Sequence, residues 1–294
     1  MKKQELTVGD RGRVGLAAPQ ADNDTQVIAM WLRGRPATTQ RAYAYEVKAL
    51  LAVVRKPLNS ITLGDLQGYF GGLADLAPAS QARAINTAKS LFSFGQRIGY
   101  LTFNPCAAMH SPKVKNTLAE RILLEDQVHR LLALEPHPRN RVLLRLLYAG
   151  GLRVSEVCGL KWRDLQERGG AGQITVYGKG GKTRFVLLSP PTWQELIALR
   201  GEAAPDSPVF TSRKGKGHLC PVQVHRIVRA AAARAGVEVP VSPHWLRHAH
   251  ASHALDRGAP VHLVQATLGH ASVANTGNYL HARPDDSSAR YLGV

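Results

Sequence analysis

The chain has 294 residues, 44% of them hydrophobic and 6% aromatic, so it is long enough to bury the cores of two globular domains. It has no apolar run that would span a bilayer and begins without a secretory signal, so we expect a cytoplasmic protein with no membrane span. Its 38 Lys and Arg residues outnumber 21 Asp and Glu, and the net charge of +17 favours a polyanionic partner, nucleic acid before a lipid surface.

The first part of the chain predicts a helical domain preceded by an arm. Residues 1–22 are polar and lack periodicity, which is typical of a flexible arm. Apolar residues recur at helical spacing in four segments, which are 25–33, 38–54, 62–73 and 79–98. The loops between these segments are short, as in a compact bundle, so we interpret residues 23–103 as one helical domain.

A linker is predicted over residues 104–117. This segment holds Pro105 and Pro112 together with basic residues and has no apolar period, so we place the domain boundary here. A flexible basic connector would let two domains close around a duplex, although such linkers are also common in proteins that clamp nothing.

Residues 118–294 predict a second domain, mainly helical with a small antiparallel β-sheet. Two β-rich runs, 173–177 and 184–188, flank a glycine-rich turn and indicate a hairpin. Helical patterns occupy the rest, over residues 124–134, 139–148, 154–160, 191–199, 223–235, 245–256 and 261–268.

The three cysteines bear on redox chemistry and metal binding. Cys106, Cys158 and Cys220 are too few and too scattered for a disulfide framework, and no two of them form a Cys-x-x-Cys pair. We expect all three to be small buried side chains.

The hairpin turn contains Gly181-Lys182-Thr183, which matches part of a nucleotide-binding P-loop. That motif also needs a glycine five residues before Gly181, where Val176 stands, and a helix after Thr183, so we reject it. Lys179 and Lys182 remain as lysines that either reach toward a phosphate along a groove or face solvent.

A candidate anion site lies farther along the chain. His244, Arg247 and His248 share one face of the first turn if Pro243 opens a helix. Helix N-termini carry free N–H groups, and an arginine fork binds phosphate with two nitrogens. Histidines that cap the helix or bridge the core are the alternative. The histidines from 248 to 281 do not repeat at metal-ligand spacing, so we expect no metal centre.

Arg153 follows the break at Gly150-Gly151, and Glu156 lies one helical turn later, where it can orient the guanidinium or form a plain surface salt bridge. With this arginine, four motifs occur in order. They are AGGLRVSE at 149–156, HWLRH at 244–248, LGH at 268–270 and Tyr279, nine residues beyond His270. In order and spacing they resemble the signature of the tyrosine recombinase, or phage integrase, family.

The resemblance covers nearly the whole chain and implies a fold, a partner and a site. The fold would be a helical core-binding domain followed by an α+β catalytic domain. The partners would be double-stranded DNA and further copies of the chain, as a tetramer on two DNA sites within the nucleoid. The site residues carried over by position are Arg153, Lys179, His244, Arg247, His270 and the nucleophile Tyr279.

The chemistry of that family accounts for this set. Arg153 and Arg247 would neutralise the non-bridging phosphate oxygens without a metal ion, and His270 would add a hydrogen bond. His244 would act as general acid or base for the phenol of Tyr279. The phenol would form a 3′-phosphotyrosine, and Lys179 would protonate the departing 5′ oxygen. The covalent link stores the bond energy, so site-specific recombination would need neither ATP nor another cofactor.

Several alternatives remain at this point. Tyr177 and Tyr291 are weaker candidates for the nucleophile, because one lies in a strand and the other is far from His270. Gly277-Asn278 disfavours a helix, which predicts a loosened segment before Tyr279. A type IB topoisomerase and a catalytically silent DNA-binding relative are rival functions. The tail at 287–294 could dock on a neighbour or on its own domain.

Overall fold

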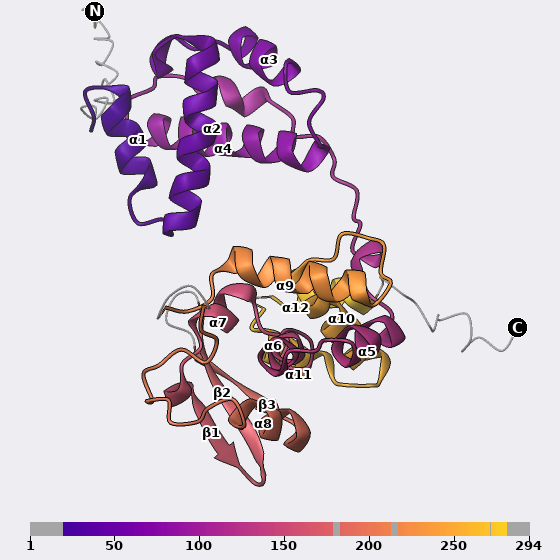
Figure 1. The fold of residues 1–294 in the computed structure, drawn as a ribbon. Coiled ribbons are helices and arrows are strands. Elements are labelled where there is room, and N and C mark those ends of the chain that lie inside the picture. The colour runs from indigo at the N-terminus through magenta and orange to yellow at the C-terminus, as the bar shows by residue number, and fades with distance from the viewer. Residues whose placement is uncertain (1–19, 179–182, 213–216, 271, 281–294) are drawn as a thin grey trace, which may run out of the picture. The chain divides into compact units, whose positions relative to one another are not determined.

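The computed structural model describes residues 20–178, 183–212, 217–270 and 272–280. The chain divides into two compact units, the first ending at Lys115 and the second beginning at Asn116 (Figure 1). Most of the predicted arm, the hairpin lysines Lys179 and Lys182, and the tail at 287–294 lie outside the described residues. Of the helices that are described, none is both long and apolar enough to cross a membrane.

The first unit is built from the four helices that the apolar periodicity predicts. They are α1 (Asp24–Leu32), α2 (Ala37–Val54), α3 (Leu63–Gly71) and α4 (Pro78–Arg97). Thr62 begins α3 with a capping box, in which its hydroxyl accepts from the backbone N–H of Asp65 and the Asp65 carboxylate accepts in return. The helices enclose a core in which Leu91 and Phe92 are fully buried.

Part of the predicted linker belongs to the first unit. Residues Pro105–Ala108 form a 3₁₀ turn that packs against α4, and Cys106 is fully buried in the core of this unit. Asn104 caps the turn by accepting a hydrogen bond from the Cys106 N–H. Pro105 and the missing helical period therefore mark a buried turn at this point, because a short 3₁₀ segment leaves no periodic signal.

The second unit contains eight α-helices among its described residues, grouped around a central one, and two short 3₁₀ helices, Ala119–Arg121 and Trp162–Asp164. Its α6 carries four fully buried leucines, Leu143, Leu144, Leu146 and Leu147, and packs against α5, α7, α8 and α10. The elements are α5 (Glu125–Ala133), α6 (Pro138–Tyr148), α7 (Val154–Gly159), α8 (Pro190–Ile197), α9 (Pro221–Arg234), α10 (Pro243–Asp256), α11 (Val261–Leu268) and α12 (Val273–Leu280).

A three-stranded antiparallel sheet lies at one end of this unit, in the order β1-β2-β3 (Figure 1). Its strands are β1 (Leu165–Arg168), β2 (Ala171–Tyr177) and β3 (Thr183–Leu188). The sheet and the helices together confirm the predicted fold class. The sequence reasoning missed β1, whose only signal is the turn-forming pair Gly169-Gly170 before β2.

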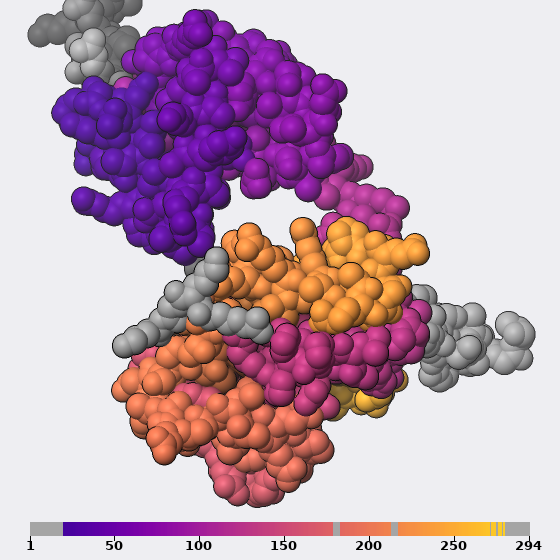
Figure 2. Space-filling model, viewed as in Figure 1, coloured from indigo at the N-terminus to yellow at the C-terminus, as the bar shows by residue number. Residues whose placement is uncertain are grey.

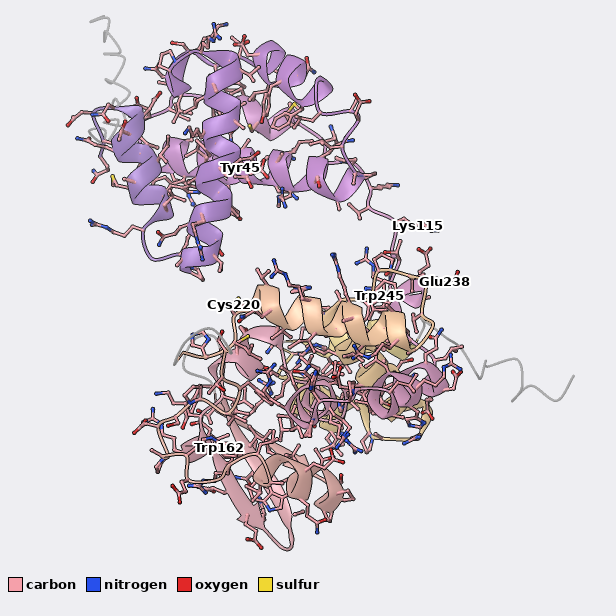
Figure 3. The ribbon with its side chains drawn as sticks, in the orientation of Figure 1. Tyr45, Lys115, Trp162, Cys220, Glu238 and Trp245 are labelled. Carbon is pink, nitrogen blue, oxygen red and sulfur yellow. The ribbon has the colours of Figure 1, made fainter. Side chains whose placement is uncertain are left out.

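The cysteines do not share one environment. Cys106 and Cys158 are buried as expected, and burial raises the pKa of the Cys158 thiol to about 11. The expectation was wrong for Cys220, which is exposed at the residue that precedes α9 (Figure 3). Figure 2 shows α9, in orange, on the surface of the second unit. The first two residues of α9, Pro221 and Val222, are exposed like Cys220 before them.

The expected loosening before Tyr279 was also wrong, since residues Val273–Leu280 form the regular helix α12. Gly277 costs helix stability, but α12 packs against both α10 and α11 and buries Thr276 completely. Tertiary contacts of this kind outweigh a propensity deficit of about 1 kcal/mol.

Candidate active site

Arg153 is held at the start of α7 by a tight turn. Gly151 adopts a left-handed conformation at φ +56°, and a Cβ atom there would lie only 2.8 Å from Leu268, so the turn requires glycine. Glu156 accepts the Arg153 backbone N–H at 2.7 Å and its Nη1 at 2.9 Å. The predicted orientation of Arg153 by Glu156 is therefore what the structure contains.

Arg247 lies on the first turns of α10 and is only 3% exposed. Within the described part of the chain, its guanidinium donates to carbonyls and to no carboxylate. Nη1 donates to the carbonyl of Gly151 and Nη2 donates to the carbonyl of Leu268 at 2.5 Å. Burial and the charge of Arg153 lower the pKa of Arg247 to about 10, so it remains a cation at neutral pH.

The end of α11 brings three arginines together. The carbonyls of Thr267, Leu268 and Gly269 accept in turn from Arg184 at 2.8 Å, Arg247 at 2.5 Å and Arg153 at 3.1 Å. The last carbonyls of a helix have no partner within it and form its negative end, which attracts cations. Gly269 ends the helix at φ +62°, as the left-handed cap.

His270 follows directly and faces the last helix. Its Nδ1 lies 2.9 Å from the Thr276 hydroxyl, and its ring is nearly parallel to that of Tyr279, with centroids 6.4 Å apart. Nine residues separate His270 from Tyr279 in the sequence. The two turns of α12 that lead to Tyr279 bring its phenol ring beside the imidazole ring of His270.

The Tyr279 side chain is 6% exposed and its hydroxyl lies 2.7 Å from Nδ1 of His248. Burial raises the pKa of Tyr279 above its ordinary value of 10, and the charge of Arg247 offsets part of that rise. The phenol is therefore protonated at neutral pH.

The Tyr279 hydroxyl contacts a different histidine from the one expected. His244, which the sequence interpretation paired with Tyr279, stacks on the ring of His248 at 5.8 Å, and His248 contacts the hydroxyl. The two rings lie one helical turn apart on α10, on the shared face that the sequence predicts. His248 was thus recognised as part of the anion site but was missing from the catalytic set.

The histidines of the site are neutral. Burial, followed by nearby positive charges, lowers the pKa of His248 and of His270 to about 4. The His244 ring reaches the surface, yet the protein packed around it, Arg247 and Arg153 also lower its pKa below 6.5. A neutral imidazole has one nitrogen that accepts a proton. Among the described residues, no group of three or more His, Cys, Asp or Glu side chains is placed to hold a metal ion.

Two further side chains complete the description. Lys179 lies outside the described residues, in the sequence between β2 and β3. Arg184, the second residue of β3, was not singled out from the sequence, where it is one of many basic residues. It forms a bidentate ion pair with Glu156, at 2.8 Å for each contact. The only sequence signal for Arg184 is that it alternates with two apolar residues, Val186 and Leu188. These lie on the same face of β3 and are buried.

Comparison with known proteins identifies the family of the chain. The model of the phage integrase family matches residues 121–285. The tyrosine recombinase XerC of Myxococcus xanthus is 32% identical over 271 residues, covering 84% of this chain and 88% of that protein. The tyrosine recombinase XerD of Rhizobium meliloti is 34% identical over 272 residues, covering 85% and 86%.

A solved structure extends the similarity to the fold. A lambda integrase tetramer bound to a Holliday junction is 20% identical, with a TM-score of 0.68 over 86% of this chain and 78% of that one. The sequence matches and the fold lead to one conclusion: this chain belongs to the phage integrase family and is a site-specific recombinase of the tyrosine type, an enzyme that breaks and rejoins DNA.

Proposed function

We propose that this recombinase cleaves one DNA strand with Tyr279 as the nucleophile, without a metal ion or ATP, and rejoins it through a 3′-phosphotyrosine. The observation that carries the proposal is the 2.7 Å contact between the Tyr279 hydroxyl and the neutral His248 ring. A phenol with a raised pKa needs a base as it attacks, and this imidazole is within reach of its proton.

The two arginines supply the positive charge for the phosphate. Arg153 is partly open to solvent, while Arg247 is buried behind it against the carbonyls of Gly151 and Leu268. Both are pre-positioned by backbone contacts, so little reorganisation is needed as negative charge builds on the non-bridging oxygens. His270 adds a neutral hydrogen-bond donor beside the nucleophile.

The proton on the phenol passes to His248, which requires that its other nitrogen, Nε2, hold the existing proton. His244 stacks on His248 with ring centroids 5.8 Å apart and is the more exposed of the two side chains. We assign His248 the base role that the sequence pattern suggested for His244, and Lys179 the protonation of the 5′ oxygen.

The partner is double-stranded DNA and the working assembly is a tetramer on two DNA sites. The net charge of +17 supports the first, and similarity to a lambda integrase tetramer bound to a Holliday junction supports the second. The place of action that follows is the cytoplasm, on the nucleoid. The site-specific function accounts for the whole matched length, including the helical first unit, better than a topoisomerase or a silent relative.

The nucleophile is tested by Tyr279→Phe, which removes one oxygen and little surface. We expect this variant to bind target DNA with nearly unchanged affinity and to form no covalent protein–DNA adduct, as seen by denaturing gel electrophoresis of a nicked substrate. Tyr177→Phe is the matched control, because Tyr177 is 68% exposed on β2 and is expected to leave adduct formation intact. An adduct with Tyr279→Phe would overturn the assignment.

A further inference from the structure

Glu156 is a carboxylate between two arginines. Its side chain is 9% exposed, and it pairs with Arg184, which is 12% exposed, and with Arg153, which is 36% exposed. Burial alone would raise its pKa, but the hydrogen bonds from Arg184 and Arg153 and the charge of Arg184 lower it to about 2. The three side chains together carry a single net positive charge at neutral pH.

Arg184 is committed to protein contacts on each side of its guanidinium. Nη1 and Nη2 donate to the two oxygens of Glu156, both at 2.8 Å, and Nε donates to the carbonyl of Thr267 at 2.8 Å. Its Cδ atom is packed so closely on Gly269 that a Cβ there would lie 3.0 Å away. Each of the three guanidinium nitrogens of Arg184 therefore donates to protein, so this side chain acts on the site through Glu156 and the end of α11.

Arg153 contacts Glu156 differently. Only its Nη1 reaches the carboxylate, at 2.9 Å, while Nη2 donates to the Gly269 carbonyl at 3.1 Å. The bidentate geometry, which is the stronger one for an arginine and a carboxylate, is taken by Arg184. Glu156 thus fixes the direction of Arg153, whereas its charge is balanced chiefly by the more buried arginine.

The consequence depends on a charge count. Without Arg184, the charge of Glu156 would cancel that of Arg153, and the pair would offer no net charge to a phosphate. In a partly buried site, charges a few ångströms apart interact far more strongly than in water, so this cancellation would weaken the stabilisation of the transition state.

We propose that Arg184 is a positioning residue for strand cleavage, which balances the carboxylate of Glu156 so that the charge of Arg153 is available to the DNA phosphate. This inference rests on the proposed phosphate-binding role of Arg153. It gives a function to the ion pair between β3 and α7, which a purely structural account would treat as a buried salt bridge of the fold.

The test is a double-mutant rescue. Arg184→Met keeps most of the aliphatic volume and leaves Glu156 with Arg153 alone. We expect single-turnover cleavage of a nicked substrate to fall by roughly ten- to a hundredfold, or about 1.4–2.7 kcal/mol in the barrier, while DNA affinity stays within about threefold. Glu156→Gln added to Arg184→Met removes the unbalanced charge and should restore at least about tenfold of the lost rate.

A conservative variant and a matched pair complete the experiment. Arg184→Lys keeps the charge without the fork and should cleave faster than Arg184→Met. Arg234, at the end of α9, pairs with Glu135, which follows α5 and is 1% exposed, so this pair joins other elements of the same unit. Arg234→Met, alone or with Glu135→Gln, should leave the cleavage rate of the folded protein unchanged.

Each outcome decides the inference. Charge balancing predicts that the double variant, Arg184→Met with Glu156→Gln, cleaves faster than Arg184→Met alone. A purely structural role of the ion pair predicts that the second substitution causes further damage. A double variant that cleaves no faster would therefore show that charge balancing is wrong. If Arg184→Met does not fold, Arg184→Lys replaces it, and a loss as large as that of Arg153→Ala would contradict the inference. Normal cleavage by Arg153→Ala would instead refute the proposed role of Arg153 and can be recognised separately.

Discussion

The two sides of the site hold their arginines by different means. On the α10–α12 side, Arg247 is buried and held by neutral carbonyls, and the neighbouring His248 and Tyr279 are also uncharged at neutral pH. On the α7–β3 side, Arg153 is partly exposed and held by the charged Glu156, which itself requires Arg184.

The two sides differ in whether the group that orients the arginine also cancels its positive charge. Carbonyl dipoles orient Arg247 without cancelling its charge, but the burial is costly, and this shows as a pKa lowered to about 10. A carboxylate orients Arg153 at less cost in solvation but removes charge from the site unless another cation balances it. The two sides are alternative solutions to fixing an arginine beside a phosphate.

The largest expected effect distinguishes the two arginines by stability. Arg247→Ala and Arg153→Ala should each slow cleavage by roughly 10²–10³-fold, the usual loss of one charge-stabilising group. Arg247→Ala also leaves two buried carbonyls without donors and should lower the free energy of unfolding by about 2 kcal/mol or more. Arg153→Ala should lower it by less than about 1 kcal/mol. Chemical denaturation measures both, and equal losses would break the comparison.

The next effect concerns the base on the α10–α12 side. His248→Asn keeps a polar group near Tyr279 but removes the proton acceptor, so single-turnover cleavage should fall by about 10²-fold with DNA binding retained. His253→Asn on the same helix is the control for chemistry, because His253 contacts Tyr148 and the Leu123 carbonyl instead of the nucleophile. A larger effect on cleavage from His253→Asn than from His248→Asn would contradict the assignment.

A smaller effect is the response of stability to pH. The unfolded chain protonates its histidines as the pH falls through 6.5, whereas His248, His250 and His270 stay neutral in the fold until about pH 4. The unfolded state therefore binds more protons in this window, and the free energy of unfolding falls as the pH drops from 6.5 to 4. Glu156, with a pKa of about 2 against 4.5, loses its contribution only below pH 4.5.

His250→Asn measures one histidine's share of that loss. The decrease in unfolding free energy between pH 6.5 and 4 should be about 2 kcal/mol smaller in this variant than in the parent chain. Thermal or urea unfolding at several pH values provides the measurement. An unchanged pH slope would mean that the folded environment of His250 does not disfavour its charged form.

The smallest expected effect tests the shared end of α11. Gly269→Ala imposes a left-handed conformation on alanine and crowds Arg184, whereas Gly236→Ala imposes a similar conformation at φ +68° in open space. Both should lose about 1 kcal/mol of stability. Only Gly269→Ala should also slow cleavage, by a few fold. Equal cleavage rates in the two variants would show that crowding of Arg184 does not disturb the site.

The sequence predicts the helices well because each carries a long apolar period, and it predicts the hairpin because β-rich runs flank glycines. It fails where the signal is short or is overruled by packing. The strand β1 is four residues long and largely exposed, and Val273–Leu280 is a helix because its neighbours bury Thr276. These contacts come from α10 and α11, which no local pattern includes.

For the site, the motifs bring the correct segments together but do not determine which atoms meet. His244 and His248 occupy one helical face, and only the packing of α12 against α10 decides that His248 contacts the nucleophile. The role of Arg184 is harder still to predict from the sequence, because its partner Glu156 is 28 residues away. Its importance is visible only once the carboxylate is seen to be shared.

The end of α11 also joins the separate elements of the site to one support. The last two carbonyls of this short helix and that of its cap, Gly269, hold Arg184, Arg247 and Arg153, which come from three different elements. Three successive backbone groups thus set the spacing of the three guanidinium groups. Tyr279 packs in one apolar cluster with Leu268, so the nucleophile and the arginines rest on the same helix end.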